Sequence, residues 1–447
     1  MPGLTQQLAE FVAALRFEAL PAEAVQTVTR GAIDCIGVLF AGRDEPVVGV
    51  VGDIVPPGSE AQVLFDRGRA SAPDAALLNG TAAHALDYDD TGIDGHPSVV
   101  LVPAALAEGE RTGASGAELI AAYVAGYETW AELVARDADK HHGKGWHPTA
   151  VFGTVAAAAA AARLAKLDAA RTASALGIAA SLAAGLVANF GSMTKPFQAG
   201  RAAQSGLLAA RLAAAGMSAA PDALEHRAGF LRALSPAGRV RTDGEIAAGR
   251  EWHILRHGLN VKRYPVCYAL HRSIDGALEL IGRHDLHPEQ VAGVELRIGR
   301  LQAGMLRHSR PRTALDAKFS AEFAMASALV ARRVGLAELS DEFVRSAAVQ
   351  TLMPKVRVST HDEPDPEEPL FAAWDAVSIA LEDGRTLAGE PVRHARGHAR
   401  NPVGLEELRV KFDDCVSAAL PDGARAKLWG QLLALETLPR VSALYHS

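Results

Sequence analysis

The chain has 447 residues, more than one ordinary core holds, which predicts two domains. Its net charge of −7 gives no general affinity for nucleic acid, so an anion would need a local basic site. Three isolated cysteines, at positions 35, 267 and 415, argue against a disulfide framework or a zinc knuckle. The N-terminal residues have the pattern of an amphipathic helix rather than a signal peptide, so we expect a cytoplasmic protein.

Nearly every segment up to about residue 235 has helical periodicity, with Gly or Pro between segments. Short strands are plausible around residues 62–65, but no glycine-rich GxGxxG loop opens a helix after a strand. The uncharged stretch Thr172–Thr194 is long enough to span a membrane. Because it is rich in Ala, Gly and Ser, we interpret it as a buried helix and expect no membrane association.

The pattern changes after about residue 265. Alternation predicts strands at 290–299 and 355–358, and Asp383-Gly384 predicts a hairpin between two further strands. Helical runs lie between these strands, and the chain becomes helical again after residue 401. The sequence predicts a mainly α fold: a large all-helical domain from both chain ends, residues 1–262 and 400–447, and a smaller inserted α+β domain, residues 263–399.

The stretch HALDYDDTGIDGHPS, residues 84–98, gathers acidic and imidazole side chains. If the preceding helix continues, Asp87 and Asp90 share one face and Asp89 points away, while two glycines let His96 fold back towards Asp87. Three interpretations stay open: a solvated loop that caps helices, a carboxylate–imidazole acid/base pair, and a Mg²⁺ site.

Two further stretches place one ring or one cation beside a helix. In HHGKGWHPTAVFG, residues 141–153, His147 precedes a helix whose N-terminus favours anions, with Thr149 as a possible N-cap. In NFGSMTKPFQAG, residues 189–200, Lys195 follows apolar helices. His147 is either a surface residue or a ligand contact, and Lys195 either a snorkelling helix end or a buried anion anchor.

A fourth stretch, NVKRYPVCYALHRS at residues 260–273, combines cations with Cys267 and His271 at i and i+4. A Cys–His nucleophile pair is conceivable, but a packed Cys with a separately functional His271 is favoured, because no third orienting residue is evident. Together the four stretches offer carboxylates, imidazoles and cations without a nucleotide loop. That set suits a small anionic substrate from which a proton is removed beside a carboxylate.

In this order, the four stretches resemble the motifs of the MmgE/PrpD family, which includes 2-methylcitrate dehydratase, cis-aconitate decarboxylase and iminodisuccinate epimerase. Two later segments, AKFSAEFAMA (317–326) and NPVGLEELRVKFDDC (401–415), look like its later motifs. The resemblance implies a helical domain from both chain ends, an inserted α+β domain, a homodimer, and an active site between the domains. It also implies chemistry without a cofactor or metal.

Carried over position by position, the resemblance implies catalytic and substrate-binding roles. The implied catalytic residues are Asp87, His96, His147, Lys195 and His271, and the implied substrate-binding residues are Thr91, Lys262 and Tyr264. No metal ligands are implied. Two positions depart from the family pattern: Gln198 stands where a His is common, and Phe323 stands where the decarboxylase has a Tyr, which removes a hydrogen-bond donor.

The sequence therefore predicts a cofactor-independent lyase or isomerase that removes a proton alpha to a carboxylate of a small di- or tricarboxylate. The expected outcome is dehydration, as in 2-methylcitrate dehydratase, or epimerisation, as in iminodisuccinate epimerase. The alternatives are a cis-aconitate-type decarboxylase, a Mg-dependent enzyme using the Asp cluster, and a carboxylate-binding protein without catalysis. The expected partner is a small anionic polycarboxylate, with no nucleic acid and no membrane, and the expected assembly is a homodimer.

Overall fold

The computed structural model describes residues 2–366 and 372–445, and the fold is mainly α, as predicted. The chain forms two compact units. The first comprises Met1–Asn260 and Leu405–Ser447, so it contains both ends of the chain, and the second comprises Val261–Gly404.

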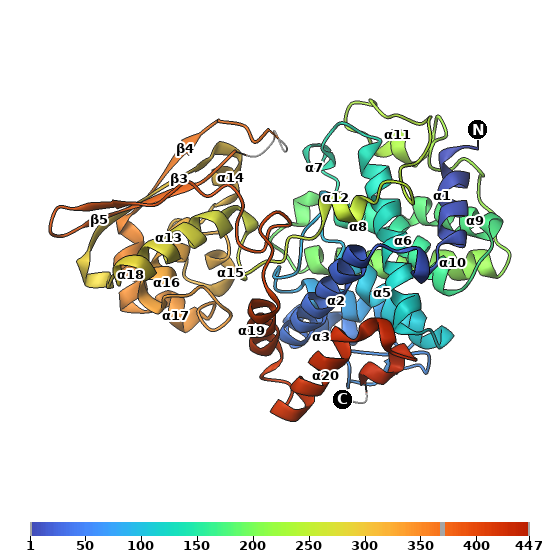
Figure 1. Ribbon diagram of the computed structural model, residues 1–447, viewed down its shortest axis with the longest axis horizontal. Coiled ribbons are helices and arrows are strands. Elements are labelled where there is room, and N and C mark those ends of the chain that lie inside the picture. Colours follow the sequence, from blue (N-terminus) through green and yellow to red (C-terminus); the bar gives the residue numbers. More distant parts are fainter. Residues whose placement is uncertain (1, 367–371, 446–447) are drawn as a thin grey trace. The chain divides into compact units, whose positions relative to one another are not determined.

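The first unit consists of helices and one small sheet (Figure 1). Its helices are α1 (Leu4–Ala14), α2 (Ala22–Gly42), α3 (Pro46–Gly52), α4 (Ala72–His84), α5 (Ser98–Thr112), α6 (Gly116–Ala135), α7 (His141–Lys144), α8 (Pro148–Leu164), α9 (Ala169–Leu182), α10 (Thr194–Ala214), α11 (Phe230–Leu234), α12 (His253–His257), α19 (Leu405–Val416) and α20 (Asp422–Leu433). The sheet pairs β1 (Ala61–Gln62) with β2 (Arg69–Ala70) in antiparallel orientation. The expectation of an all-helical domain is therefore wrong for residues 61–70.

Small side chains let the central helices of this unit approach closely. Every residue of α8 is buried, including an unbroken run of Ala from 156 to 162, and α8 packs on α6 and α10. At the crossing of α4 and α10, a Cβ on Gly200 would lie 2.2 Å from the backbone oxygen of Leu77. Only glycine permits this approach, which brings the C-terminal end of α4 near the N-terminal end of α10.

The helices of the chain's C-terminal segment pack on α2 near the start of the chain, red beside blue in Figure 1. Lys411 of α19 forms a buried ion pair with Asp34 of α2, with Nζ 2.5 Å from Oδ1. The same ammonium donates to the backbone oxygen of Tyr88 at 2.8 Å and lies 3.9 Å from the centre of its ring. The C-terminal segment thus fixes the loop that follows α4.

The stretch Thr172–Thr194 is not the single buried helix expected from the sequence. Helix α9 ends at Leu182, and the chain passes through Gly185, whose φ of +154° excludes a helix, before α10 begins. By length and apolarity, α2 is the one helix in the described residues that could cross a bilayer, but 67% of its most apolar window is buried inside the structure. Together with the buried Asp34–Lys411 pair, this marks α2 as a core helix.

The second unit is built on a four-stranded sheet of order β4-β3-β5-β6, in which β3 and β4 are parallel and the other neighbours antiparallel. The strands are β3 (Val291–Gly299), β4 (Val356–His361), β5 (Ala376–Leu381) and β6 (Thr386–Ala388). The helices are α13 (His271–His284), α14 (Arg300–Met305), α15 (Ala314–Ala317), α16 (Ala321–Ala331), α17 (Asp341–Arg345) and α18 (Ala347–Leu352). The predicted hairpin is confirmed as β5–β6, with Gly384 of its turn at φ +90°.

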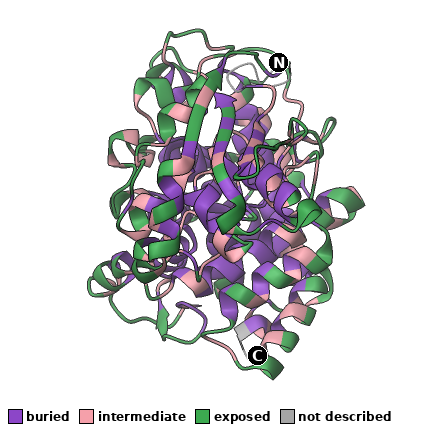
Figure 2. Ribbon diagram, turned by 90° about the vertical axis from the view of Figure 1, so that its left-hand side faces the viewer, coloured by how far each residue is buried: buried purple, intermediate pink, exposed green. Residues whose placement is uncertain are grey.

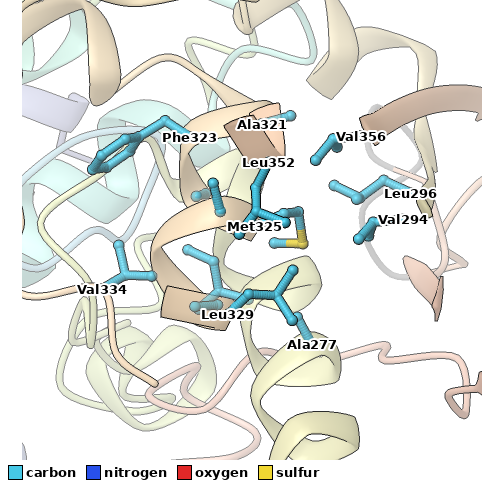
Figure 3. Close-up of a cluster of buried hydrophobic side chains, with 14 of the residues drawn as sticks. Ala277, Val294, Leu296, Ala321, Phe323, Met325, Leu329, Val334, Leu352 and Val356 are labelled. Atoms are coloured by element: carbon cyan, nitrogen blue, oxygen red, sulfur yellow. The ribbon is translucent and has the colours of Figure 1, made fainter. Parts of the chain in front are cut away.

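Buried residues alternate with exposed ones along much of β3 and with half-buried ones along β5, and Figure 2 shows the mixed burial of the sheet. The buried side of the sheet packs against α13 and α16. Figure 3 shows Met325 of α16 directed towards Leu296 of β3, with Phe323 elsewhere in the same apolar cluster. Phe323 is fully buried there, with its ring edge-to-face with that of Phe343.

Candidate active site

The loop between α4 and α5 carries the acidic motif, and its backbone leaves the helix earlier than the sequence suggested. Helix α4 ends at His84, and Asp87 has a left-handed φ of +53°, as has Asp94 at +64°. Asp87 and Asp90 therefore do not share a helical face, and the expectation that Asp89 points away is wrong. Aspartate tolerates this conformation better than most residues, which is why the loop can form here.

Asp89 is fully buried and connects two imidazole rings of the same loop. Its Oδ1 lies 2.9 Å from His84 Nδ1, and its Oδ2 lies 2.7 Å from His96 Nδ1. Burial raises the pKa of Asp89, but the two neighbouring imidazoles outweigh that effect and hold the pKa well below its usual value. Asp89 is therefore a carboxylate, and each of its oxygens accepts a hydrogen bond from one ring.

The hydrogen bonds of His96 determine which of its nitrogens is protonated. Nδ1 lies against two acceptors, Asp89 Oδ2 and the backbone oxygen of Asp90 at 3.0 Å, so Nδ1 is the nitrogen that carries hydrogen. Nε2 faces Asp87, 3.9 Å from its Oδ1. Burial lowers the pKa of His96 to about 4, so the free enzyme holds a neutral ring with Nε2 bare at neutral pH.

Lys195 lies in the first turn of α10 and completes this group. Its Nζ is 2.9 Å from Asp87 Oδ1, the same oxygen that His96 Nε2 faces, and both side chains are partly exposed. The ammonium also lies 5.2 Å from the centre of the Phe190 ring. Of the two interpretations of Lys195, an anion anchor fits this position better than a snorkelling helix end, because its side chain is only 12% exposed and its ammonium meets a carboxylate.

His147 lies beside this group and is held by Gln198. Its Nδ1 is 2.6 Å from Gln198 Oε1, and the Gln198 amide donates to the backbone oxygen of Leu186 at 3.2 Å. Because the amide oxygen is an acceptor, His147 carries its hydrogen on Nδ1. Burial lowers the pKa of His147 to about 2, and its buried Nε2 has no hydrogen-bond partner among residues 2–366 and 372–445. His147 is thus a neutral ring that can only accept a hydrogen bond through Nε2.

Three neighbouring residues hold the loop and the helices around it. Asp90 accepts hydrogen bonds from the Ser98 hydroxyl and backbone N–H at the start of α5, and burial raises its pKa well above the usual range. The backbone N–H and oxygen of Thr91 both bond to Asn260, whose amide lies 3.4 Å from the Thr91 hydroxyl. Thr149 is not the N-cap of α8, since His147 holds that position, and its hydroxyl instead accepts the His96 backbone N–H at 3.2 Å.

The remaining predicted site residues form a separate group in the second unit. Lys262, Tyr264 and His271 are all buried there. The Tyr264 hydroxyl donates to Asp275 at 2.6 Å, and the His271 ring lies edge-on to Tyr264 with centroids 5.1 Å apart. The His271 ring also packs on a second tyrosine, with its centroid 4.9 Å from that of Tyr268.

Four of the side chains around Asp89 could also hold a metal ion: His84, Asp87, Asp89 and His96 each offer one ligand atom, all within 4.8 Å of one another. Two features make the fit poor. Both imidazole Nδ1 atoms already donate to Asp89, and the Lys195 ammonium lies on Asp87. A cation that used the Nδ1 atoms would have to displace those hydrogens, and any cation in this place would lie beside the positive charge of Lys195.

The first unit thus brings Asp87, His96, His147 and Lys195 together, and it adds two residues to which the resemblance gave no role. His84 and Asp89 lie behind His96, and both are buried. The arrangement offers one ammonium that can bind a carboxylate, one imidazole nitrogen that can transfer a proton, and one imidazole nitrogen that can accept a hydrogen bond. These are the groups required to move a proton next to a carboxylate.

Comparison with known proteins gives two family matches that together cover most of the chain. Residues 6–243 match the MmgE/PrpD N-terminal domain, and residues 264–434 match the MmgE/PrpD C-terminal domain. Cis-aconitate decarboxylase of Mus musculus is 27% identical over 92% of this chain and 86% of its own length. The cis-aconitate decarboxylase-like protein oryM of Aspergillus oryzae is 28% identical over 99% and 96%, and cis-aconitate decarboxylase of Aspergillus terreus is 25% identical over 99% and 95%.

Proposed function

The chain belongs to the MmgE/PrpD family of enzymes, and from that premise we propose that it is a lyase that decarboxylates a small, cis-aconitate-like tricarboxylate. This places decarboxylation ahead of the dehydration or epimerisation that the sequence favoured. The support for the change is that the three relatives are named cis-aconitate decarboxylase or cis-aconitate decarboxylase-like protein. Each aligns over most of this chain and most of its own length.

One observation carries the proposal. Lys195 Nζ and His96 Nε2 both face Oδ1 of Asp87, at 2.9 Å and 3.9 Å. A substrate carboxylate near Asp87 therefore meets an ammonium that neutralises it, and a carbon next to that carboxylate lies within reach of an imidazole nitrogen. Asp87 keeps the ammonium and the imidazole in place until the substrate enters.

The reaction is an exchange of a carboxylate for a proton. The bond to the leaving carboxylate breaks and CO₂ departs, its electron pair shifts through the neighbouring double bond, and the carbon at the far end of that bond takes a proton. Lys195 binds a carboxylate that stays on the substrate, and the negative charges of the bound substrate favour protonation of His96, which delivers the proton from Nε2. His147 accepts a hydrogen bond through Nε2 from a protonated carboxyl group of the substrate.

Phe323 remains a departure from the decarboxylase pattern. The sequence argument was that a phenylalanine at this position removes a hydroxyl donor. Phe323 is fully buried in the apolar core of the second unit, packed against Phe343. In this chain the position serves packing, and the hydroxyl donor of the decarboxylase is lacking there.

Dehydration or epimerisation is the second candidate, and the state of His96 supports it. Since its pKa is lowered to about 4, the ring of the free enzyme is a neutral base at neutral pH, which suits removal of a proton alpha to a carboxylate. Loss of a β-hydroxyl would then give an alkene, and return of the proton to the other face would give an epimer.

Incubation in D₂O with citrate-like, aconitate-like and aspartate-derived polycarboxylates, followed by NMR, separates these outcomes. Decarboxylation of cis-aconitate gives CO₂ and a product with one new carbon-bound deuterium. A new alkene from a hydroxy acid, or deuterium exchange with stereochemical change, would favour the second candidate instead. An unchanged spectrum with every substrate would contradict both.

We also propose that the enzyme is a cytoplasmic homodimer that requires neither metal nor organic cofactor, as the family resemblance implies. Light scattering would test the assembly, with an expected mass of twice the 46.9 kDa of the chain.

A further inference from the structure

We propose that Asp89 and His84 are positioning residues for proton transfer: Asp89, itself held by His84, fixes His96 in the form whose Nε2 faces the substrate. Neither residue is exposed, so neither is expected to touch the substrate. The inference deepens the proposed function and rests on it for the kinetic part of its test.

The geometry leaves one arrangement of hydrogens. Asp89 presents one oxygen to His84 Nδ1 at 2.9 Å and the other to His96 Nδ1 at 2.7 Å. A carboxylate only accepts, so both rings must donate from Nδ1. The proton that His96 gains or loses during the reaction is therefore the one on Nε2, the nitrogen that faces Asp87 and Lys195.

Asp89 also affects how readily His96 takes up that proton. Burial lowers the pKa of His96, whereas the charge of Asp89 and its hydrogen bond raise it. Asp89 thereby keeps His96 basic enough to be protonated once a polyanionic substrate is bound. The hydrogen bond from Nδ1 also holds the ring in a single orientation, as the buried carboxylate of a Ser-His-Asp triad does for its histidine.

His84 holds the carboxylate from the opposite side. It lies at the last position of α4, fully buried, and its ring is 4.5 Å from that of His96 in an edge-to-face arrangement. Without a second donor, one oxygen of Asp89 would be buried without a hydrogen bond, and the carboxyl group could rotate or take up a proton. His84 therefore keeps Asp89 ionised and holds its second oxygen against Nδ1 of His96.

The test compares Asp89→Asn with wild type and with Asp94→Asn as the matched control. Asp94 lies in the same loop and also has a positive φ, but its carboxylate pairs at 2.6 Å with Lys140 near the surface. Asp89→Asn places an amide N–H against one of the two rings, which forces that ring to carry its hydrogen on Nε2. We expect kcat to fall about 10²- to 10⁴-fold with KM changed less than threefold.

The pH profile gives a readout that a purely structural role would not change. Asp89 raises the pKa of His96, so Asp89→Asn should lower that pKa. The part of the kcat/KM pH profile that reports the titration of His96 should therefore move to lower pH. His84→Gln keeps an N–H donor and should retain most of the activity, whereas His84→Leu should lose about 10- to 100-fold in kcat. Equal profiles for wild type, Asp89→Asn and Asp94→Asn would overturn the inference.

¹⁵N NMR of histidine-labelled enzyme tests the same inference without turnover. We expect His96 and His84 to carry hydrogen on Nδ1 in wild type and in Asp94→Asn, and one of them to switch to Nε2 in Asp89→Asn. Hydrogen on Nε2 of His96 in the wild type would overturn the inference even if the enzyme is active. If the wild type converts no polycarboxylate, the proposed function fails, and the NMR result alone decides the inference.

Discussion

Asp87, His96 and Lys195 could be singled out from the sequence, but the role of Asp89 could not. Asp89 would point away from the site only if α4 continued through residue 90, and the sequence does not show where this helix ends. No Gly or Pro marks the true end of α4 at His84. The spacing of apolar residues also gives no sign of the positive φ of Asp87. The three-dimensional turn of the loop, rather than residue spacing, therefore decides which acid meets which histidine.

Lys195 is expected to bind a substrate carboxylate. Replacement of Lys195 by Met keeps most of the side-chain volume but removes the charge, so we expect kcat/KM to fall at least about 100-fold with the fold retained. Steady-state kinetics with cis-aconitate measure the effect, and circular dichroism checks the fold. Lys140→Met, which removes the charge of a side chain that is 46% exposed in the same unit, is the control and should leave kcat/KM unchanged.

The pH dependence follows from the lowered pKa of His96. Burial brings that pKa from 6.5 to about 4, so only a small fraction of the free enzyme is protonated at neutral pH, and that fraction grows with falling pH. Decarboxylation consumes a proton, so kcat/KM should rise as the pH falls from 8 towards 5, by up to about tenfold per pH unit. A profile that is flat there and falls only below about pH 4 would instead identify His96 as a base, and would favour dehydration or epimerisation.

Among the helices and strands, those marked by turn residues or by alternating apolar residues were predictable from the sequence. The turn residues Asp383-Gly384 predicted the β5–β6 hairpin correctly, and alternation located β3 and β4. The stretch from Thr172 to Thr194 was wrongly taken as one helix, because composition showed its lack of charge but not the break at Gly185. Short strands were plausible around residues 62–65, and the β1–β2 pair overlaps that range only at Gln62, because each strand has two residues.

The crossing of α4 and α10 should be sensitive to a single methyl group. In Gly200→Ala the new Cβ would lie 2.2 Å from the backbone oxygen of Leu77, which cannot turn away as a side chain could. We expect the free energy of unfolding to fall by about 1–3 kcal/mol, measured by urea denaturation. Gly430→Ala in α20, where a Cβ meets nothing within 4 Å, is the control and should be neutral or stabilising. Equal stabilities of the two variants would contradict the close packing of the crossing.

For the chain as a whole, the C-terminal segment stabilises the loop that carries Asp87 and Asp89. Lys411 is 377 positions from Asp34 and 323 from Tyr88, yet it contacts both. No local pattern in the sequence predicts so distant a pair, and the sequence argument reached only the general expectation that the final helices return to the first domain.

The ion pair between Lys411 and Asp34 should contribute strongly to stability only when both partners are present. Lys411→Met leaves a buried carboxylate without its cation, and we expect a loss of about 3–5 kcal/mol in the free energy of unfolding. The double variant Asp34→Leu/Lys411→Met removes both charges and should recover much of that loss. Urea denaturation of the two single variants and the double variant gives the coupling energy, and additive losses would contradict a direct interaction.

The measurement that decides whether His96 transfers a proton to a polycarboxylate is the reaction of cis-aconitate in D₂O, followed by NMR for wild type and His96→Gln. We expect the wild type to release CO₂ and to place one deuterium on a carbon of the product. His96→Gln should slow both events together, by about 10²- to 10⁴-fold, while the fold is retained. CO₂ release and deuterium incorporation at wild-type rates in His96→Gln would contradict this account.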